Sequence, residues 1–385
     1  MNHSFLKLLP TLALPILFSL AALASPTAQA GELLSQPMPG ATTHRETTIL
    51  FEAKNSHHAI LSYSPSDAPQ QTQKIKLLAP APHPLGGQIY RFTLQLLRPG
   101  TRYNYEITLD GKKLNFPQPL QFQTLADWQF RATAPDFSFI TGSCNYLNDQ
   151  PYDRPGKPYG QGDHILDHMA RSGADFMLWL GDSLYLRPAD YSSASGIWYR
   201  YQREFSAPEF QALRSAMHHY AIWDDHEYGP NDSDKTYRLK ETALQVFQSY
   251  WANPSYGEPD NPGVYTSFTW SDCAFFLLDN RYHRDANDLD PKTHPNKTQF
   301  GPRQIDWLKQ SLLNHKNARF KFIVMGGQFL HDHKFESFSK FPAERQHILD
   351  FLKTHQINGV VFISGDRHFT ELTKMPAPAA TPSTT

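Results

Sequence analysis

The chain has 385 residues, which is long for one simple hydrophobic core and suits a targeting segment followed by two domains. Its formal net charge of −1 and sequence pI near 7.0 exclude the strongly basic surface typical of proteins that bind nucleic acid stably. Apolar residues make up 40 % and aromatic residues 13 % of the chain, and its 30 prolines indicate a folded protein with many turns.

Residues 1–30 are predicted to be a signal peptide. Lys7 precedes an apolar stretch at 8–23, and small residues lead to a cleavage site at Ala28-Gln29-Ala30. The alternative is an uncleaved membrane anchor. No later stretch is long and apolar enough to span a bilayer, and no cysteine follows the cleavage site to carry a lipid. We therefore expect an exported protein, periplasmic or extracellular, without a stable membrane anchor.

Residues 31–130 predict a β-sandwich, because short runs with alternating polarity are separated by Pro and Gly clusters. The runs are THRETTILFEA, HAILSYS, QIYRFTLQL, TRYNYEITLDGK and LQFQTL. The segment LRPGTRYNYEITLDG resembles the fibronectin-like strand pair that precedes catalytic domains in some secreted phosphatases. Since the region holds no cluster of ligand residues, we expect its role to be structural.

Residues 137–374 predict an α/β domain, because strand-like runs now alternate with helical periodicity. The strands are expected at 137–141, 175–180, 219–223, 273–278, 320–325 and 359–364, and the helices at 164–170, 236–251, 303–314 and 343–355. The aromatic residues between Trp198 and Phe205 indicate a further helix that packs on the core.

Candidate metal ligands follow several of these strands. Open α/β sheets gather their ligands beyond the carboxyl ends of the strands, so such residues are expected to converge at one edge. The predicted metal ligands are Cys144, Asp182, Tyr185, Asn231, Asp366 and His368.

Asp182 is expected to bridge two ions, because Gly181 lets the chain turn sharply after a buried strand. Tyr185 lies three residues later and can reach the same metal, although it can equally cap the core. Cys144 follows the first strand, where inert packing is the alternative. A thiolate and a phenolate together favour high-valent iron over magnesium or calcium.

The segment Trp223-Asp224-Asp225-His226-Glu227 crowds ionisable groups directly after an apolar strand, and such crowding is costly without ions or hydrogen bonds. His226 and Asp225 are therefore predicted catalytic residues, with His226 as general acid or phosphate donor. Either Asn231 or Asp232 can supply an oxygen ligand, and we favour Asn231.

Asp366 and His368 point to the same side of an extended chain, so each can bind one of two metals. Arg281 and Arg367 are predicted phosphate contacts, with a salt bridge to a neighbouring Asp as the equal alternative. Gln328, at the strand exit after Gly326-Gly327, is a predicted substrate contact.

In this order the motifs GSC, GDSLY, WDDHEYGPND, LLDNRYHR, GPRQIDWL, VMGGQ and GDRHFTEL resemble the alkaline phosphatase D family of metallophosphoesterases. The resemblance runs from about Thr141 to Thr373. It implies paired β-sheets between helical layers, iron (Fe3+) held by residues matching Cys144, Asp182, Tyr185 and His368, and calcium held by those matching Asp182, Asn231 and Asp366. Other divalent metals are compatible with the same donors.

The predicted function is hydrolysis of phosphate monoesters, diesters or both, by a water activated between two metals, in a monomer whose only partner is the phosphate ester. One alternative is a phospholipase or nuclease type of phosphodiesterase. The other is an inactive, truncated family member that acts as a surface-binding module. This second alternative arises because residues 375–385 read as a disordered tail where family members continue with further strands.

Overall fold

The computed structural model describes residue 1 and residues 31–374, except 154, 161, 163 and 332–335. Apart from Met1, the predicted signal peptide lies outside the described residues, as does the predicted tail 375–385. Among the described residues, no helix combines the length and the apolar composition needed to cross a membrane.

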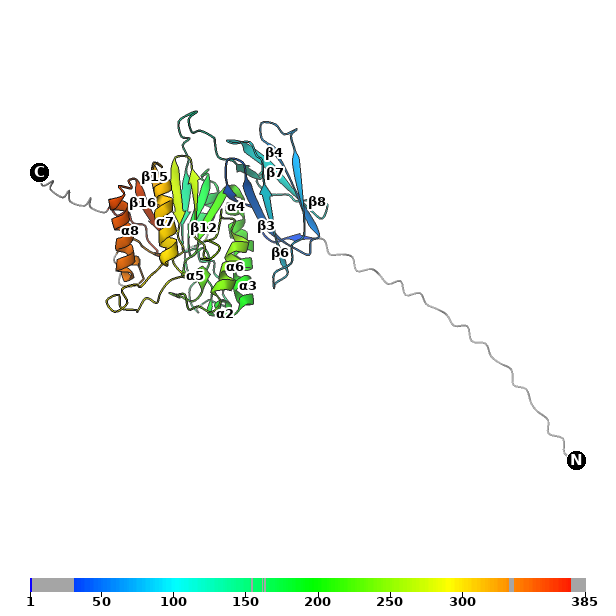
Figure 1. Cartoon of the computed structure of the whole chain (residues 1–385). Helices are drawn as coiled ribbons and strands as arrows, with labels where there is room; N and C mark the ends of the chain where they lie inside the picture. Colours follow the sequence, from blue (N-terminus) through cyan, green and yellow to red (C-terminus); the bar gives the residue numbers. More distant parts are fainter. Residues whose placement is uncertain (2–30, 154, 161, 163, 332–335, 375–385) are drawn as a thin grey trace.

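Two antiparallel sheets form the N-terminal region (Figure 1). In one sheet β3 (Thr47–Lys54) pairs with β1 (Glu32–Leu33), β2 (Met38–Thr42) and β6 (Gly87–Leu94). In the other, β4 (His58–Pro65) and β7 (Arg102–Leu109) pair with each other and with β5 (Gln73–Leu78), β8 (Lys112–Lys113) and β9 (Gln121–Gln123). Inward side chains of both sheets, such as Phe51 and Leu61, share one core. Five of these strands coincide with the alternating runs in the sequence.

The C-terminal region contains two further sheets. The first is parallel throughout, in the order β10 (Phe139–Gly142), β11 (Phe176–Leu180) and β12 (His218–Ile222). The second has the order β13 (Thr266–Trp270), β14 (Cys273–Leu277), β15 (Phe320–Met325) and β16 (Val360–Ser364), and only β13 is antiparallel to its neighbour. The six predicted strands are all present within two residues of their expected limits, and β13 is an addition.

The two sheets pack face to face, because their strands carry large apolar side chains on both sides. In β11, Phe176, Leu178 and Leu180 belong to the core between the sheets. In β14, Phe275 and Leu277 belong to the same core, and the rings of Phe176 and Phe275 lie 5.5 Å apart in an edge-to-face arrangement. Near-continuous apolar strands of this kind are typical of sheets covered on both faces.

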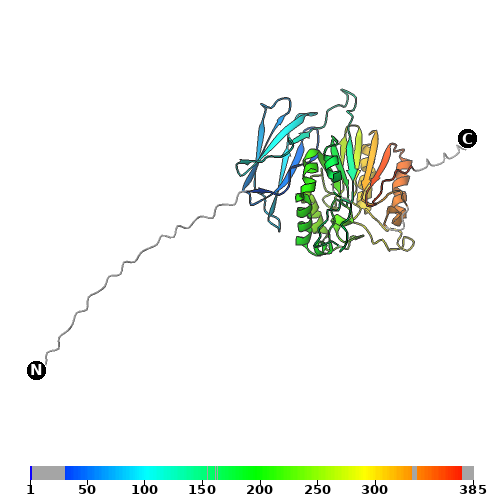
Figure 2. The ribbon, with the colours of Figure 1, turned by 180° about the vertical axis from the view of Figure 1, so that it is seen from behind.

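Helices cover the two outer faces (Figures 1 and 2). On the first sheet the covering helices are α3 (Ala194–Ser206), α4 (Pro208–Ala216) and α6 (Lys240–Tyr250), and on the second they are α7 (Pro302–Asn314) and α8 (Pro342–Thr354). The remaining short helices are α1 (His164–Ala170), α2 (Pro188–Tyr191), α5 (Asp225–Tyr228) and the 3-10 turn Phe338–Lys340. The α6 helix begins four residues later than predicted, because the Asp234 side chain accepts hydrogen bonds from the backbone N–H and hydroxyl of Thr236 and holds a turn there.

Polar contacts join the N-terminal region to the first sheet and its helices. The Glu52 carboxylate, 1 % exposed, accepts hydrogen bonds from Gln202 at 2.6 Å and Tyr250 at 3.0 Å. It also lies 2.8 Å from Nε2 of His83, whose ring stacks on Trp198. The His83 side chain, 5 % exposed, is therefore buried in this contact.

His219 in β12 is a buried histidine whose two ring nitrogens are already used. The Trp179 indole donates to Nδ1 at 3.1 Å, so the ring proton sits on Nε2 and points to the Leu213 carbonyl at 3.0 Å. Burial lowers the pKa of His219 to about 3, because a second proton on Nδ1 would be desolvated and would face an N–H donor.

We expect His219 to weaken the fold in acid. Below pH 6.5 the unfolded chain takes up a proton at His219 that the folded chain does not, until the pH reaches about 3. The free energy of unfolding should therefore fall by about 1.4 kcal/mol for each pH unit in that window from this residue alone. Urea titrations of wild type and His219→Gln should show the difference between their free energies of unfolding narrowing as the pH falls. A difference that stays constant across this pH range would contradict the role of His219.

Candidate metal centre

The parallel strands of both sheets end on the same side of the molecule, and their exits are tied together. The Gly365 N–H after β16 donates to the Gly326 carbonyl after β15 at 2.7 Å. In the other sheet, the Asn145 N–H after β10 donates to the Asp182 carbonyl after β11 at 2.8 Å. Each of these hydrogen bonds therefore holds two neighbouring strand exits of one sheet together.

Three of the predicted ligands share an uncommon backbone conformation. The φ angles of Cys144, Asp182 and Asp366 are +59°, +52° and +69°, in the left-handed region that disfavours residues other than glycine. Each of the three lies one or two residues beyond the end of its strand. Strain of this kind persists only when the surrounding structure imposes it, and it concentrates at functional sites.

The Asp224 side chain lies between strand exits of the two sheets, and two glycines make room for it. A Cβ on Gly181 would come within 2.7 Å of the Asp224 Cβ, and a Cβ on Gly326 within 2.5 Å of its Cγ. Gly181 also has a φ of +86°. The glycines of the GDSLY and VMGGQ motifs therefore let strand exits from both sheets close over a fully buried carboxylate.

Asp182 is at the centre of the predicted ligands. Its Oδ2 lies 3.7 Å from the Cys144 sulfur and 3.4 Å from the Tyr185 hydroxyl. Its Oδ1 accepts from the backbone N–H of His226 at 3.4 Å. The thiol, phenol and carboxylate thus face one another, as a shared metal ion would require.

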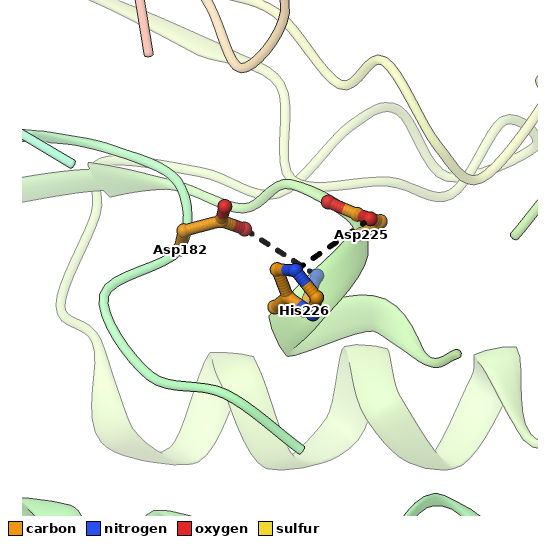
Figure 3. A group of neighbouring side chains, drawn as sticks. All are labelled: Asp182, Asp225 and His226. Atoms are coloured by element: carbon orange, nitrogen blue, oxygen red, sulfur yellow. Dashed lines mark hydrogen bonds and ion pairs between the residues drawn. The ribbon is translucent and has the colours of Figure 1, made fainter. Parts of the chain in front are cut away.

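His226 and Asp225 complete a compact group with Asp182 (Figure 3). The three residues offer ligand atoms that all lie within 4.8 Å of one another. The His226 ring lies 3.9 Å from Asp225 Oδ2 and packs on the Tyr185 ring at a centroid distance of 4.1 Å. Sequence reasoning assigned His226 a proton-transfer role, and this geometry also suits it as a ligand.

A second acidic group adjoins the first through Asp225. The carboxylates of Asp225, Asp232 and Glu336 lie within 4.8 Å of one another, and the Asp232 N–H donates to Asp225 Oδ2 at 2.8 Å. The side chain of Asn231 is exposed. Sequence reasoning did not single out Glu336, since the segment around it, FESFSK, carries no ligand motif and only the fold brings it here.

Burial, and for some of them the charge of neighbouring carboxylates, raises the pKa values of four acids at the site. Burial, and then the charges of neighbouring carboxylates, hold the pKa of Asp182 well above its usual range. Burial raises the pKa of Glu227 to about 7. Burial also raises the pKa of Asp366, to about 6, although the charge of Arg367 acts to lower it. Partial desolvation and then Glu336 raise the pKa of Asp232 to about 7.

The donor set fits bound cations. Burial also raises the pKa of the Cys144 thiol, to about 11, so without a cation this thiol favours its neutral form. Within the described part of the chain, Asp224 Oδ2 is buried without a hydrogen-bond donor. Cations beside these groups would favour their charged forms, and thiolate, phenolate and carboxylate donors suit a hard or borderline metal.

Arg281 takes the salt-bridge role left open by the sequence. Its guanidinium is fully buried, with bonds to Asp224 at 2.5 Å and a two-pronged pair to Glu336 at 2.6 and 3.0 Å. Arg284 adds a contact to Glu336 at 2.5 Å. Burial acts to raise the pKa of Glu336, but the two arginines more than offset it and leave that pKa below its usual range.

Gln328 and Arg367 link the exits of β15 and β16. The Gln328 side chain donates to the Gly365 carbonyl at 2.5 Å and accepts from Arg367 Nε at 3.1 Å. Arg367 also lies 3.3 Å from Asp366 and donates to the Glu336 carbonyl at 2.6 Å. His368 is exposed. The pKa of His226 is lowered, and burial is the first cause.

The sequence of this chain matches the model of a known protein family. The model of the PhoD-like phosphatases matches residues 143–384, which is more than half of the chain. The chain belongs to the PhoD-like phosphatase family. The resemblance read from the seven motifs is therefore confirmed.

Individual relatives agree with this family. Alkaline phosphatase D of Bacillus subtilis (strain 168) is 25 % identical over 311 residues, covering 69 % of this chain and 49 % of that protein. The chain thus spans about half the length of the curated relative it matches. The solved structure of PhoD has a TM-score of 0.74 at 18 % identity, covering 89 % of this chain and 73 % of that chain.

A more distant structure shares the same fold class. Purple acid phosphatase PPD1 from yellow lupin (Lupinus luteus) seeds has a TM-score of 0.56 at 13 % identity, covering 85 % of this chain and 57 % of that chain. At these identities both structural likenesses speak to the fold alone. They support the predicted metallophosphoesterase-like architecture of paired sheets.

Glu227 holds the segments after β11 and β12 together. Its carboxylate accepts from the backbone N–H groups of Asp182 at 2.7 Å and of Ser183, which follow β11, and from that of Asp224 at 3.0 Å, which follows β12. A side chain without acceptor oxygens at this position would leave these buried N–H groups unpaired.

We expect Glu227→Ala to lower the free energy of unfolding by about 3 kcal/mol or more, because it strands three buried donors. Glu227→Gln should lie in between, since it keeps one acceptor oxygen. Urea denaturation followed by circular dichroism would measure both. Glu106→Ala, which removes an exposed ion pair with Lys113, is the control and should cost less than about 1 kcal/mol. Equal losses in Glu227→Ala and the control would contradict this role.

Proposed function

We propose that this chain is an exported, metal-dependent phosphoesterase that hydrolyses phosphate monoesters, diesters or both. The observation that carries the proposal is the meeting of Cys144, Asp182 and Tyr185 at the carboxyl ends of parallel strands, beside the carboxylates of Asp225 and Asp366. Membership of the PhoD-like phosphatases supports the same chemistry. Localisation in the periplasm or outside the cell rests on the predicted signal peptide.

We further propose that Fe3+ is held by Cys144, Asp182, Tyr185 and His368, and calcium by Asp182, Asn231 and Asp366. The distances around Asp182 support its bridging role. Asp232 is the competing ligand for the second ion, because its carboxylate lies in the acidic group with Asp225 and Glu336. When bound, the two ions would neutralise the carboxylates, polarise the phosphoryl group and lower the pKa of a water.

The chain's own residues then orient and protonate the substrate. The His226 side chain is 22 % exposed, so it is accessible from solvent, while Tyr185 and Asp225 fix its ring. We assign it the proton transfer to the leaving oxygen, with Asp225 as the group that orients it. Arg367, held by Gln328 and Asp366, is the cation best placed to pair with a phosphoryl oxygen, because Arg281 is enclosed by acids.

For the rest of the chain, we propose domain limits of 31–130 and 137–374 and a structural role for the N-terminal region, whose sequence is fibronectin-like. Glu52 supports this role, because its hydrogen bonds from Gln202 and Tyr250 brace the helices on the outer face of the first sheet.

Turnover should be sensitive to chelation. The full mature chain, supplied with Fe3+ and Ca2+, is expected to hydrolyse an aryl phosphodiester or an aryl phosphate, and excess chelator should abolish the reaction. The assay compares both substrates with and without chelator and with each metal alone. A cooperatively folded sample that turns over neither substrate would contradict the proposed function.

Substitutions at the centre should separate the two metals. Asp182→Ala is expected to lose both metals and turnover, because it removes the bridging carboxylate. Cys144→Ser should lose iron while calcium stays, as measured by elemental analysis and visible absorption. Cys273→Ser is the control, since Cys273 is also a free cysteine but begins β14, at the end of the strand opposite to the site. Iron retained in Cys144→Ser would remove Cys144 from the ligand set.

A further inference from the structure

Arg187 is a buried arginine that lies beside the candidate site without any part in the chemistry proposed so far. It follows Tyr185 by two residues and precedes α2. Only 4 % of the residue is exposed. A buried guanidinium is costly unless its donors are paired, so its partners define its purpose.

The donors of Arg187 reach two different loops. Nε donates to Asp153 Oδ1 at 3.0 Å and Nη2 to the Leu147 carbonyl at 2.8 Å, and both partners lie in the loop that follows Cys144. Nη1 donates to the carbonyl of Tyr185, in the loop that follows Asp182. One planar side chain therefore joins the loops that carry the thiol and the phenol.

The face of the guanidinium continues this link through aromatic rings. Its Cζ lies 4.2 Å from the centroid of the Tyr146 ring, whose hydroxyl donates to the same Asp153 oxygen at 2.6 Å. Tyr146 in turn packs edge-to-face on Tyr185 with centroids 5.0 Å apart, and the Tyr185 ring also contacts the His226 ring. Arg187 thus holds Tyr185 in two ways: directly at its backbone carbonyl, and indirectly through the Tyr146 ring.

We infer that Arg187 is a positioning residue that holds the Tyr185 phenol against Asp182 and Cys144, an inference that rests on the proposed metal site. Lysine cannot substitute fully, because only the rigid fork of arginine donates in three directions at once while stacking on a ring. The role is indirect: Arg187 acts on the site through Tyr185 and the Cys144 loop.

A neighbouring arginine offers a matched control. Arg203 lies in the same charge network, with contacts to Asp149 at 3.2 Å and Glu204 at 2.8 Å. Its guanidinium also donates to the Asn148 carbonyl at 2.5 Å. Among the described residues, these partners of Arg203 do not include Tyr185 or Tyr146. Loss of Arg203 should therefore perturb the loop and the charge network but leave the link between Arg187 and Tyr185 intact.

The test uses the full mature chain loaded with Fe3+ and compares wild type with Arg187→Gln, Arg187→Lys, Arg203→Gln and Tyr185→Phe. The readouts are iron content, the visible charge-transfer absorption of iron bound to phenolate and thiolate, and kcat and KM for an aryl phosphodiester. We expect Arg187→Gln to keep iron but shift or weaken the band and to lower kcat by about 100-fold, as a small misplacement of a reacting group can. Arg187→Lys should be intermediate, and Arg203→Gln should keep the wild-type band.

The outcomes distinguish this inference from the proposed function. A wild-type chain that shows no band, or a Tyr185→Phe variant that keeps it unchanged, would overturn the metal site and this inference together. A wild-type band that is identical in folded Arg187→Gln would overturn the inference alone. If Arg187→Gln does not fold cooperatively, Arg187→Lys decides the matter, since a band and kcat equal to wild type would reject the positioning role.

Discussion

Negative charge is concentrated at the carboxyl ends of the parallel strands, and the elements around the candidate site hold it there. Among the described residues, seven carboxyl groups gather at this end, those of Asp182, Asp224, Asp225, Glu227, Asp232, Glu336 and Asp366. Arg281, Arg284 and Arg367 balance part of this charge. Bound cations would balance more of it, so the fold is arranged around a charge that its own side chains do not neutralise completely.

Two kinds of interaction bring these groups together against their repulsion. The phenylalanine-rich core between the sheets aligns the ends of β11 and β12 with those of β15 and β16. Backbone N–H groups then donate hydrogen bonds to the carboxylates, and the Glu227 carboxylate accepts from three of them. The hydrophobic packing is remote from the site and the hydrogen bonds lie within it, so the first sets the distance between strand exits and the second sets their direction.

Much of this arrangement follows from the sequence. Strands β10, β11, β12, β14, β15 and β16 are apolar runs that are each followed within two residues by Gly, Ser or Asp. The rule that strand exits gather ligands predicted the meeting of Cys144 and Asp182. Local patterns carried no signal for Glu336, which reaches the site only through tertiary packing, or for the enclosure of Arg281 by Asp224 and Glu336. Likewise, the sequence around His83 carries no signal that Glu52 and Trp198 enclose its ring.

The buried Asp224 side chain has a consequence for how this region tolerates change. Gly181 and Gly326 belong to segments far apart in the chain, one following a strand of each sheet, yet a Cβ added at either glycine would collide with the same residue, Asp224. A methyl group added at either glycine would clash with the Asp224 side chain. That side chain cannot move aside, because it is paired with Arg281 and fully buried. The three positions thus form a single steric unit, in which the two glycines and the acid are expected to vary together or remain as they are.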